Sequence, residues 1–211
     1  MIERLIFTAQ LRPGRKNDLC RAAAQSAARL PQTMGTMSLF VWQKRLFLYC
    51  ETENAGLSAD DAFHFADDCL ELWPGEEQPR RWVRMPEIFH YNCPVSAAQW
   101  KRPQPMHPWA QIARLRPETL SRYVYYHYQY QEERPGDGNK YGIMALHENL
   151  AFFYLEAPTI RETAPRPGAL ATRLRPENWG EVMAPHFIPW EDERPGVYWK
   201  KIERLYTREA E

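Results

Sequence analysis

The stretch RLFLYCETE (45–53) decides the fold, because it recurs as LAFFYLEAP (150–158) in the second half of the chain. The recurrence places Tyr49 in register with Tyr154 and Glu51 in register with Glu156. Two further pairs follow the same order: FTAQLRPGRKNDL (7–19) with QIARLRPETLSRY (111–123), and MPEIFHYN (85–92) with KIERLYTR (201–208). Three ordered matches indicate two copies of one unit of about a hundred residues.

Both halves show the same order of strand-like and helix-like patterns. The first half predicts a strand at 2–12, a helix at 15–30, a hairpin at 36–43 and 45–53, a helix at 58–72 and a strand at 82–91. The second half predicts a strand at 109–116, a helix at 118–132, a hairpin at 141–147 and 150–156, a short helix at 178–183 and a strand at 197–207. A proline-rich excursion fills 157–176.

A β-α-β-β-α-β order is ferredoxin-like, and the helices of such a unit cover only one face of its sheet. The other face must be covered as well, and a second copy can cover it. We therefore predict an α+β fold with two tandem ferredoxin-like repeats packed as an intramolecular α+β barrel. The repeats are residues 1–92 and 109–211, and 93–108 is a proline-rich linker. This arrangement favours a monomer with an internal pseudo-dimer, or a weak homodimer.

Composition excludes several partners. The 211 residues carry 27 basic and 27 acidic side chains, so no electrostatic footprint for nucleic acid or for an anionic membrane follows. No apolar run approaches the roughly 20 residues of a membrane span. The opening MIERLIFTAQLRP has no signal-peptide pattern, so a cytoplasmic protein is expected. The four cysteines (Cys20, Cys50, Cys69 and Cys93) fit no zinc spacing and are expected to be free thiols.

The segment RYVYYHYQYQ (122–131) is the candidate site, because it holds five tyrosines and one histidine. On the helix at 118–132, Tyr123 and His127 are four residues apart and lie on one face. Aromatic residues that merely fill space would not need a polar tip on nearly every ring. This pattern favours a pocket for a polar small molecule, although a stripe of packing residues would also explain the ring volume.

The second half resembles the L-rhamnose mutarotase family. The resemblance rests on Tyr123 and His127 in the first helix, NKYGIMAL (139–146) with Tyr141, AFFYLE (151–156), and NWGEVM (178–183) with Trp179. PEIFHY (86–91), in the first half, matches the family's last strand. The chain departs from the family at Gly180, where a second Trp is expected, and in a shorter loop after His127.

The resemblance implies a mutarotase that interconverts the anomers of a deoxyhexose such as L-rhamnose, without cofactor or metal. His127 would be the general acid, since an imidazole with a pKa of about 6.5 exchanges protons near neutral pH. Tyr123 and Tyr141 would hold sugar hydroxyls, and Trp179 would stack on the sugar ring. A small-molecule sugar is the expected partner. Leu19 and Ala23 replace Tyr and His in the first copy, which is expected to lack a site.

Two alternatives remain at this point. A haem-binding protein would use His127 or His186 as the axial ligand of the iron. A non-catalytic sugar or metabolite binder would keep the pocket without the activity.

Overall fold

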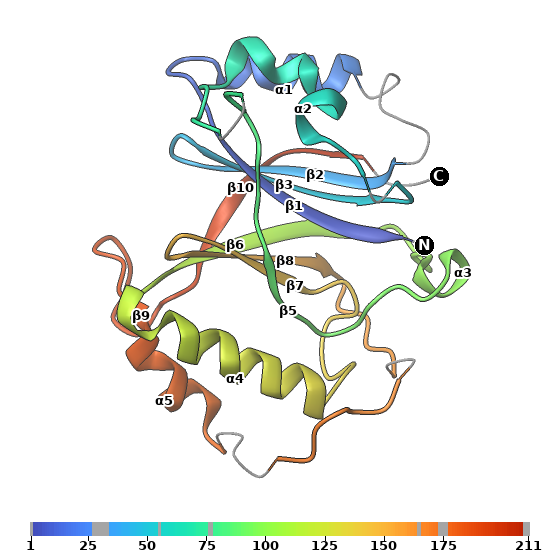
Figure 1. Ribbon diagram of the computed structural model, residues 1–211, viewed down its shortest axis with the longest axis vertical. Coiled ribbons are helices and arrows are strands. Elements are labelled where there is room, and N and C mark those ends of the chain that lie inside the picture. Colours follow the sequence, from blue (N-terminus) through green and yellow to red (C-terminus); the bar gives the residue numbers. More distant parts are fainter. Residues whose placement is uncertain are drawn as a thin grey trace. The chain divides into compact units, whose positions relative to one another are not determined.

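The structure, a computed structural model, describes residues 2–26, 34–54, 56–75, 78–163, 166–172 and 177–208 (Figure 1). The chain has a mixed α+β architecture and divides into two compact units. The first unit comprises Met1–Met85, Pro94–Lys101 and Ile202–Glu211. The second unit comprises Pro86–Cys93 and Arg102–Lys201.

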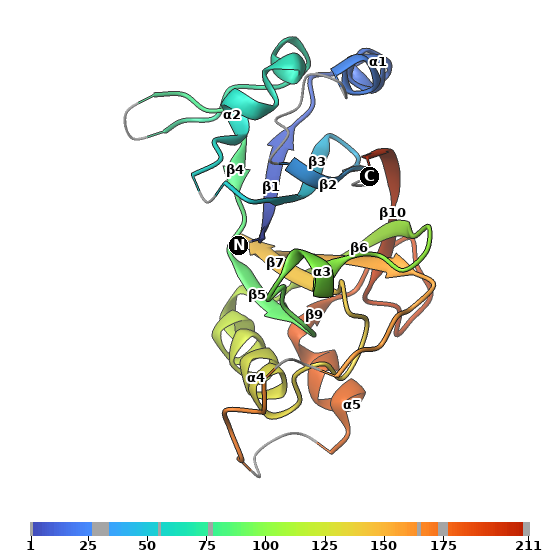
Figure 2. The same cartoon turned by 90° about the vertical axis from the view of Figure 1, so that its right-hand side faces the viewer.

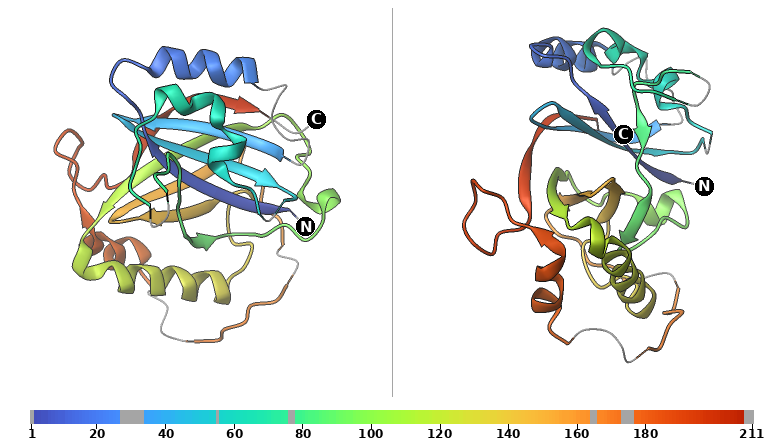
Figure 3. Two further views of the ribbon diagram at one scale, coloured as in Figure 1. Left: turned by 45° about the horizontal axis from the view of Figure 1, so that its top comes forward. Right: turned by 60° about the vertical axis from the view of Figure 1, so that its left-hand side comes forward.

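The first unit contains an antiparallel sheet in the order β4-β1-β3-β2-β10. Its strands are β1 (Glu3–Gln10), β2 (Met34–Trp42), β3 (Arg45–Thr52), β4 (Val83–Arg84) and β10 (Lys200–Arg208), of which the part from Ile202 onward belongs to this unit. The helices α1 (Lys16–Ser26) and α2 (Ala59–Ala62) lie over one face of β1, β3 and β2 (Figure 3). The short helix α3 (Ala97–Trp100) falls in the segment expected to be an irregular linker.

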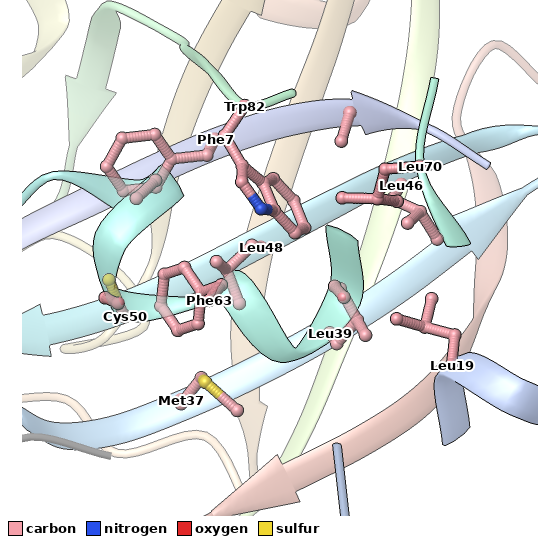
Figure 4. Close-up of a cluster of buried hydrophobic side chains, with 14 of the residues drawn as sticks. Phe7, Leu19, Met37, Leu39, Leu46, Leu48, Cys50, Phe63, Leu70 and Trp82 are labelled. Carbon is pink, nitrogen blue, oxygen red and sulfur yellow. The ribbon is translucent and has the colours of Figure 1, made fainter. Parts of the chain in front are cut away.

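The core of the first unit fills the space between this sheet and its helices. Leu39, Leu46 and Leu48 of the sheet pack with Leu19, Phe63 and Trp82 in one buried cluster (Figure 4). Leu19 and Ala23, which occupy the positions of Tyr123 and His127 in the repeat register, are fully buried.

The second unit contains a second antiparallel sheet, in the order β9-β6-β8-β7-β5. Its strands are β5 (Glu87–His90), β6 (His107–Leu115), β7 (Ile143–His147), β8 (Leu150–Ala157) and β9 (Phe187–Ile188). The helices α4 (Leu120–Glu133) and α5 (Trp179–Met183) lie on the same face of this sheet (Figure 2). Single-turn 3₁₀ segments, Pro117–Thr119 and Ala184–His186, precede α4 and follow α5.

The strand predicted at 82–91 is divided between the two units. β4 pairs with β1 in the first unit, whereas β5, only two residues later, pairs with β7 in the second. Pro86 lies at the break, where its missing N–H cannot continue a ladder. The observed division therefore differs from the expected halves: 86–93 belongs to the second unit, and 94–101 and 202–211 belong to the first.

The recurrent Tyr-x-Glu motif has the same local geometry in both units. Residues two apart on a strand share a face, so each tyrosine can reach its glutamate. Tyr49 Oη donates to Glu51 Oε1 at 2.6 Å, and Tyr154 Oη donates to Glu156 Oε1 at 2.8 Å. Both carboxylates are buried, with 4% of Glu51 and 1% of Glu156 exposed. A linker residue completes each pair: Trp100 Nε1 donates to Glu51, and Arg102 forms an ion pair with Glu156.

Two predicted helices of the first half differ from the structure. The helix expected at 58–72 is only α2 followed by a 3₁₀ segment, His64–Cys69. Phe63, Ala66 and Cys69 are buried at a spacing of three, which a 3₁₀ helix keeps on one line and an α-helix would not. The helix expected at 15–30 is described as far as Ser26, and its predicted last turn lies outside the described residues.

All four cysteines are free thiols, as expected, and Cys50 and Cys69 are buried. Burial raises the pKa of both thiols. Over the described ranges, no helix is both long and apolar enough to cross a bilayer.

Candidate binding pocket on the α4 face

A cavity of about 440 Å³ lies in the second unit, walled by α4, α5 and the sheet. It is lined by Phe89, Tyr91, Tyr123, His127, Tyr130, Met144, Phe153, Trp179, Gly180, Met183, Phe187, Tyr198 and Trp199. None of the described lining residues is charged. The cavity is therefore aromatic and apolar. Among its described lining residues, His127 is the one whose ordinary pKa lies nearest to 7.

The face of α4 that meets the cavity carries Tyr123, His127 and Tyr130. Their spacing of four and three residues places them one above the other on a helix, and the sequence predicted this for Tyr123 and His127. Tyr125 and Tyr128 turn away from this face and are half exposed. The ring-rich segment thus divides into a cavity wall and an outer surface.

His127 is buried, with 5% of its surface exposed. Its Nδ1 lies 2.8 Å from the backbone carbonyl oxygen of Tyr123. A carbonyl only accepts hydrogen bonds, so Nδ1 carries the hydrogen of the neutral ring and Nε2 carries the lone pair. No other hydrogen bond of this ring occurs within the described part of the chain. Nε2 is therefore the atom that can meet a ligand.

Burial lowers the pKa of His127 to about 4. Desolvation is the main cause, and the positive form is also disfavoured by nearby His186, while the hydrogen bond to Tyr123 acts in the opposite direction. At neutral pH the imidazole is uncharged. It can accept a proton or a hydrogen bond at Nε2, but it is a poor proton donor, which departs from its expected role as general acid.

Three rings surround the imidazole. The ring centroid of Tyr123 lies 4.2 Å from that of His127, Trp179 lies at 5.0 Å and Phe89 at 5.4 Å. Trp179 also contacts Tyr130, at 5.3 Å. The structure therefore brings together three predicted site residues: Tyr123, His127 and Trp179.

Some tyrosine hydroxyl groups of the pocket already have partners within the protein. Tyr130 Oη donates to Asp137 Oδ2 at 2.9 Å, and Tyr123 Oη lies 3.5 Å from the sulfur of Met144, a weak acceptor. Desolvation raises the pKa of Tyr123, Tyr130 and Tyr91 above the ordinary tyrosine value. All three phenols are neutral at physiological pH and offer O–H groups rather than charge.

The fourth predicted residue, Tyr141, is not in the pocket, and the expectation that it shares a space with His127 is wrong. Arg102 lies over the Tyr141 ring, 4.3 Å from its centroid, and the same guanidinium binds Glu156. Glu156 and Tyr154 occupy the face of β8 opposite to Phe153, which lines the cavity. Tyr141 therefore lies on the side of the sheet that faces away from α4.

The cavity wall also contains residues that the sequence did not single out. Phe89 and Tyr91 come from β5 and the residues that follow it, in the first half of the sequence. Tyr91 packs closely on the loop after α4, since a Cβ at Gly138 or Gly142 would lie 2.4 or 2.7 Å from its ring. Tyr198 and Trp199 complete the wall through Phe187, which stacks on Tyr198 with centroids 4.9 Å apart.

The described residues offer little to bind a metal ion or a haem group. The described side chains include no group of three or more His, Cys, Asp or Glu residues placed to hold a metal ion. His127 Nε2 has the lone pair that an axial haem ligand needs, but no described lining residue could pair with the two haem carboxylates. His186 is buried and does not line the cavity, and its Nε2 has no hydrogen bond to any residue that the structure describes. The lining does not match haem.

Fold and site together define a mixed α+β protein with an aromatic-walled pocket of small-molecule size. No family model and no curated protein matches the chain. A solved structure from Lactobacillus acidophilus, provisionally described as a monooxygenase, is 8% identical with a TM-score of 0.42, covering 98% of this chain and 95% of that one. A second, from Fusobacterium nucleatum with the same description, is 7% identical with a TM-score of 0.40, covering 75% and 76%. Likeness at this level assigns neither family nor activity.

Proposed function

We propose that the second unit binds a flat, neutral, largely apolar small molecule that donates one hydrogen bond to Nε2 of His127. The observation that carries this proposal is a neutral imidazole, fixed as the Nδ1–H tautomer, in a wall otherwise made of aromatic and methionine side chains. A phenol-bearing ring system has the required chemistry. Its ring faces match the aromatic walls, and its O–H matches the imidazole lone pair.

The charge and volume of the pocket narrow the ligand class. The absence of charge among the described lining residues disfavours a carboxylate or an ammonium, because an unpaired buried charge is strongly unfavourable. The volume of about 440 Å³ lies within the range of pockets that take drug-sized ligands. The ligand is therefore an uncharged ring system.

Isothermal titration calorimetry at pH 7.5 tests this proposal with two ligands of one shape. The neutral 2-naphthol should bind, and the anion 2-naphthoate should bind at least about tenfold more weakly because its charge is desolvated. Failure of 2-naphthol to bind, or tighter binding of the anion, would overturn the proposal.

A sugar mutarotase is the second candidate, favoured by the meeting of Tyr123, His127 and Trp179 in one pocket. With its lowered pKa, His127 would take the proton of the anomeric hydroxyl rather than supply one to the ring oxygen. The wall offers few of the polar partners that sugar hydroxyls require, and Tyr141 is not among them. These features make the sugar the weaker fit.

NMR measurement of anomer exchange on L-rhamnose decides on this second candidate. A mutarotase would accelerate exchange, and His127→Ala would remove most of that acceleration, since a general acid–base group contributes about 10²–10⁴-fold. An exchange rate equal to that of buffer alone excludes it.

That the two units are duplicated ferredoxin-like copies, packed as an intramolecular barrel, stays a prediction. It is supported by the matching strand orders and by the Tyr-x-Glu geometry within each unit. Light scattering on the purified chain should give the mass of one chain, or a concentration-dependent rise from it. A stable higher oligomer would contradict the prediction of a monomer with an internal pseudo-dimer or a weak homodimer.

A further inference from the structure

Gly180 is a lining residue that neither backbone conformation nor packing explains. It is the second residue of α5 and lies beside Trp179 at the wall of the cavity. Its φ is not positive, so an L-residue would be unstrained there. A Cβ at this position would meet no atom within 4 Å among the described residues.

The contrast with two other glycines of the second unit is informative. At Gly138 and Gly142, a Cβ would lie 2.4 and 2.7 Å from the ring of Tyr91, so close packing requires glycine at both. At Gly180 no such neighbour exists in the described structure. Glycine within a helix is also less stable than alanine, because its unfolded chain has more freedom to lose. The open space beside Gly180 is therefore not used by the protein's own described side chains.

We infer that Gly180 is the size-determining residue of the pocket, and that the space beside it receives part of the ligand. Gly180 is exposed while it lines the cavity, which places it at the mouth. A compact ligand beside His127 would stay clear of this space, whereas a larger fused-ring ligand would extend past Gly180 toward solvent. This inference rests on the proposed function, and it explains why position 180 is a glycine.

Two ligands and two variants test the inference by calorimetry. The probes are 2-naphthol, with two fused rings, and 1-hydroxypyrene, with four, and both carry a neutral O–H. Gly180→Leu should weaken 1-hydroxypyrene at least about tenfold more than it weakens 2-naphthol, because the leucine side chain would occupy the space that the larger ligand needs. Gly180→Ala, which adds one methyl group, should weaken 1-hydroxypyrene less than Gly180→Leu does.

A stability measurement checks that the variants are folded. Gly180→Ala should raise the melting temperature by about 1–3 °C, since alanine suits the helix and meets no clash. A lowered melting temperature would show that the protein itself uses the space, and would overturn the inference.

The failure of this inference can be distinguished from the failure of the proposed function. If the parent binds neither probe, the proposed function is wrong and the inference falls with it. If the parent binds both and Gly180→Leu weakens neither, or weakens both equally, the pocket stands and the role of Gly180 is wrong.

Discussion

Nδ1 of His127 donates to the backbone carbonyl oxygen of Tyr123, one helical turn earlier, at 2.8 Å, and the two rings lie 4.2 Å apart. This relationship fixes the tautomer of the imidazole and turns its Nε2 lone pair away from its own helix. The pairing follows from the i, i+4 spacing in the sequence. Its chemical consequence, a neutral acceptor in a desolvated chamber, depends on the surrounding walls.

The stability of the protein should depend on the protonation of His127. Unfolded His127 has an ordinary pKa of about 6.5, and the folded ring has a pKa of about 4. Between these values the unfolded state binds more protons, so the free energy of unfolding falls as the pH drops from 6.5 toward 4. Near pH 4, this difference in pKa lowers the free energy of unfolding by about 3 kcal/mol relative to neutral pH. Urea denaturation at several pH values measures it.

His127→Gln removes this titration, so its unfolding free energy should vary less with pH over the same window. His107→Gln provides the control, because His107 is exposed and lies outside the pocket. Parallel pH dependences for the parent and His127→Gln would contradict a lowered pKa.

The ion pair of Arg102 with Glu156 should be required for stability. Glu156 is buried, and Arg102 approaches its carboxylate at 2.6 and 3.2 Å. Arg102→Met would leave a buried carboxylate without its cation, which costs about 3–5 kcal/mol. Chemical denaturation should show this loss. Arg134→Met, which removes an exposed 3.7 Å pair with Asp137, should cost less than about 1 kcal/mol; equal losses would refute the distinction.

Substitution of Trp179 should weaken ligand binding, whereas substitution of Tyr141 should leave it unchanged. Trp179 contacts both His127 and Tyr130, so Trp179→Leu should weaken 2-naphthol by about tenfold, in line with a lost aromatic contact. Tyr141 lies on the opposite side of the sheet, under Arg102, so Tyr141→Phe should leave the dissociation constant unchanged within error. A larger effect of Tyr141→Phe would mean that the pocket has been placed on the wrong face.

The sequence predicted the two hairpins, the helix at 118–132 and one wall of the pocket, because these depend on local spacing. The α4 face follows from a period of 3.6 residues, and both hairpins lie close to their predicted positions. The sequence did not predict which of the two faces of β7 and β8 meets α4, and the expected place of Tyr141 in the pocket was wrong for this reason. Nearly all residues of β7 and β8 are buried on both faces, so hydrophobic periodicity does not distinguish them.

The sequence did not predict the part of the cavity wall that Phe89 and Tyr91 form, for a different reason. Phe89 and Tyr91 were expected to belong to the first repeat, since the segment 82–91 is one continuous strand-like run. The break at Pro86 was the available signal, because proline interrupts a ladder. The transfer of β5 to the second sheet depends on its pairing with β7, which is a long-range contact that local pattern does not encode.

The most direct test of the central claim compares 2-naphthol with 2-methoxynaphthalene, a ligand of similar shape without the O–H, on the parent and on His127→Phe. We expect the parent to prefer the naphthol by about 5–150-fold, as a buried hydrogen bond to Nε2 would give. The preference should vanish in His127→Phe, which keeps the ring volume and removes the lone pair. A naphthol preference that persists unchanged in His127→Phe would contradict the claim that Nε2 of His127 receives the ligand's hydrogen bond.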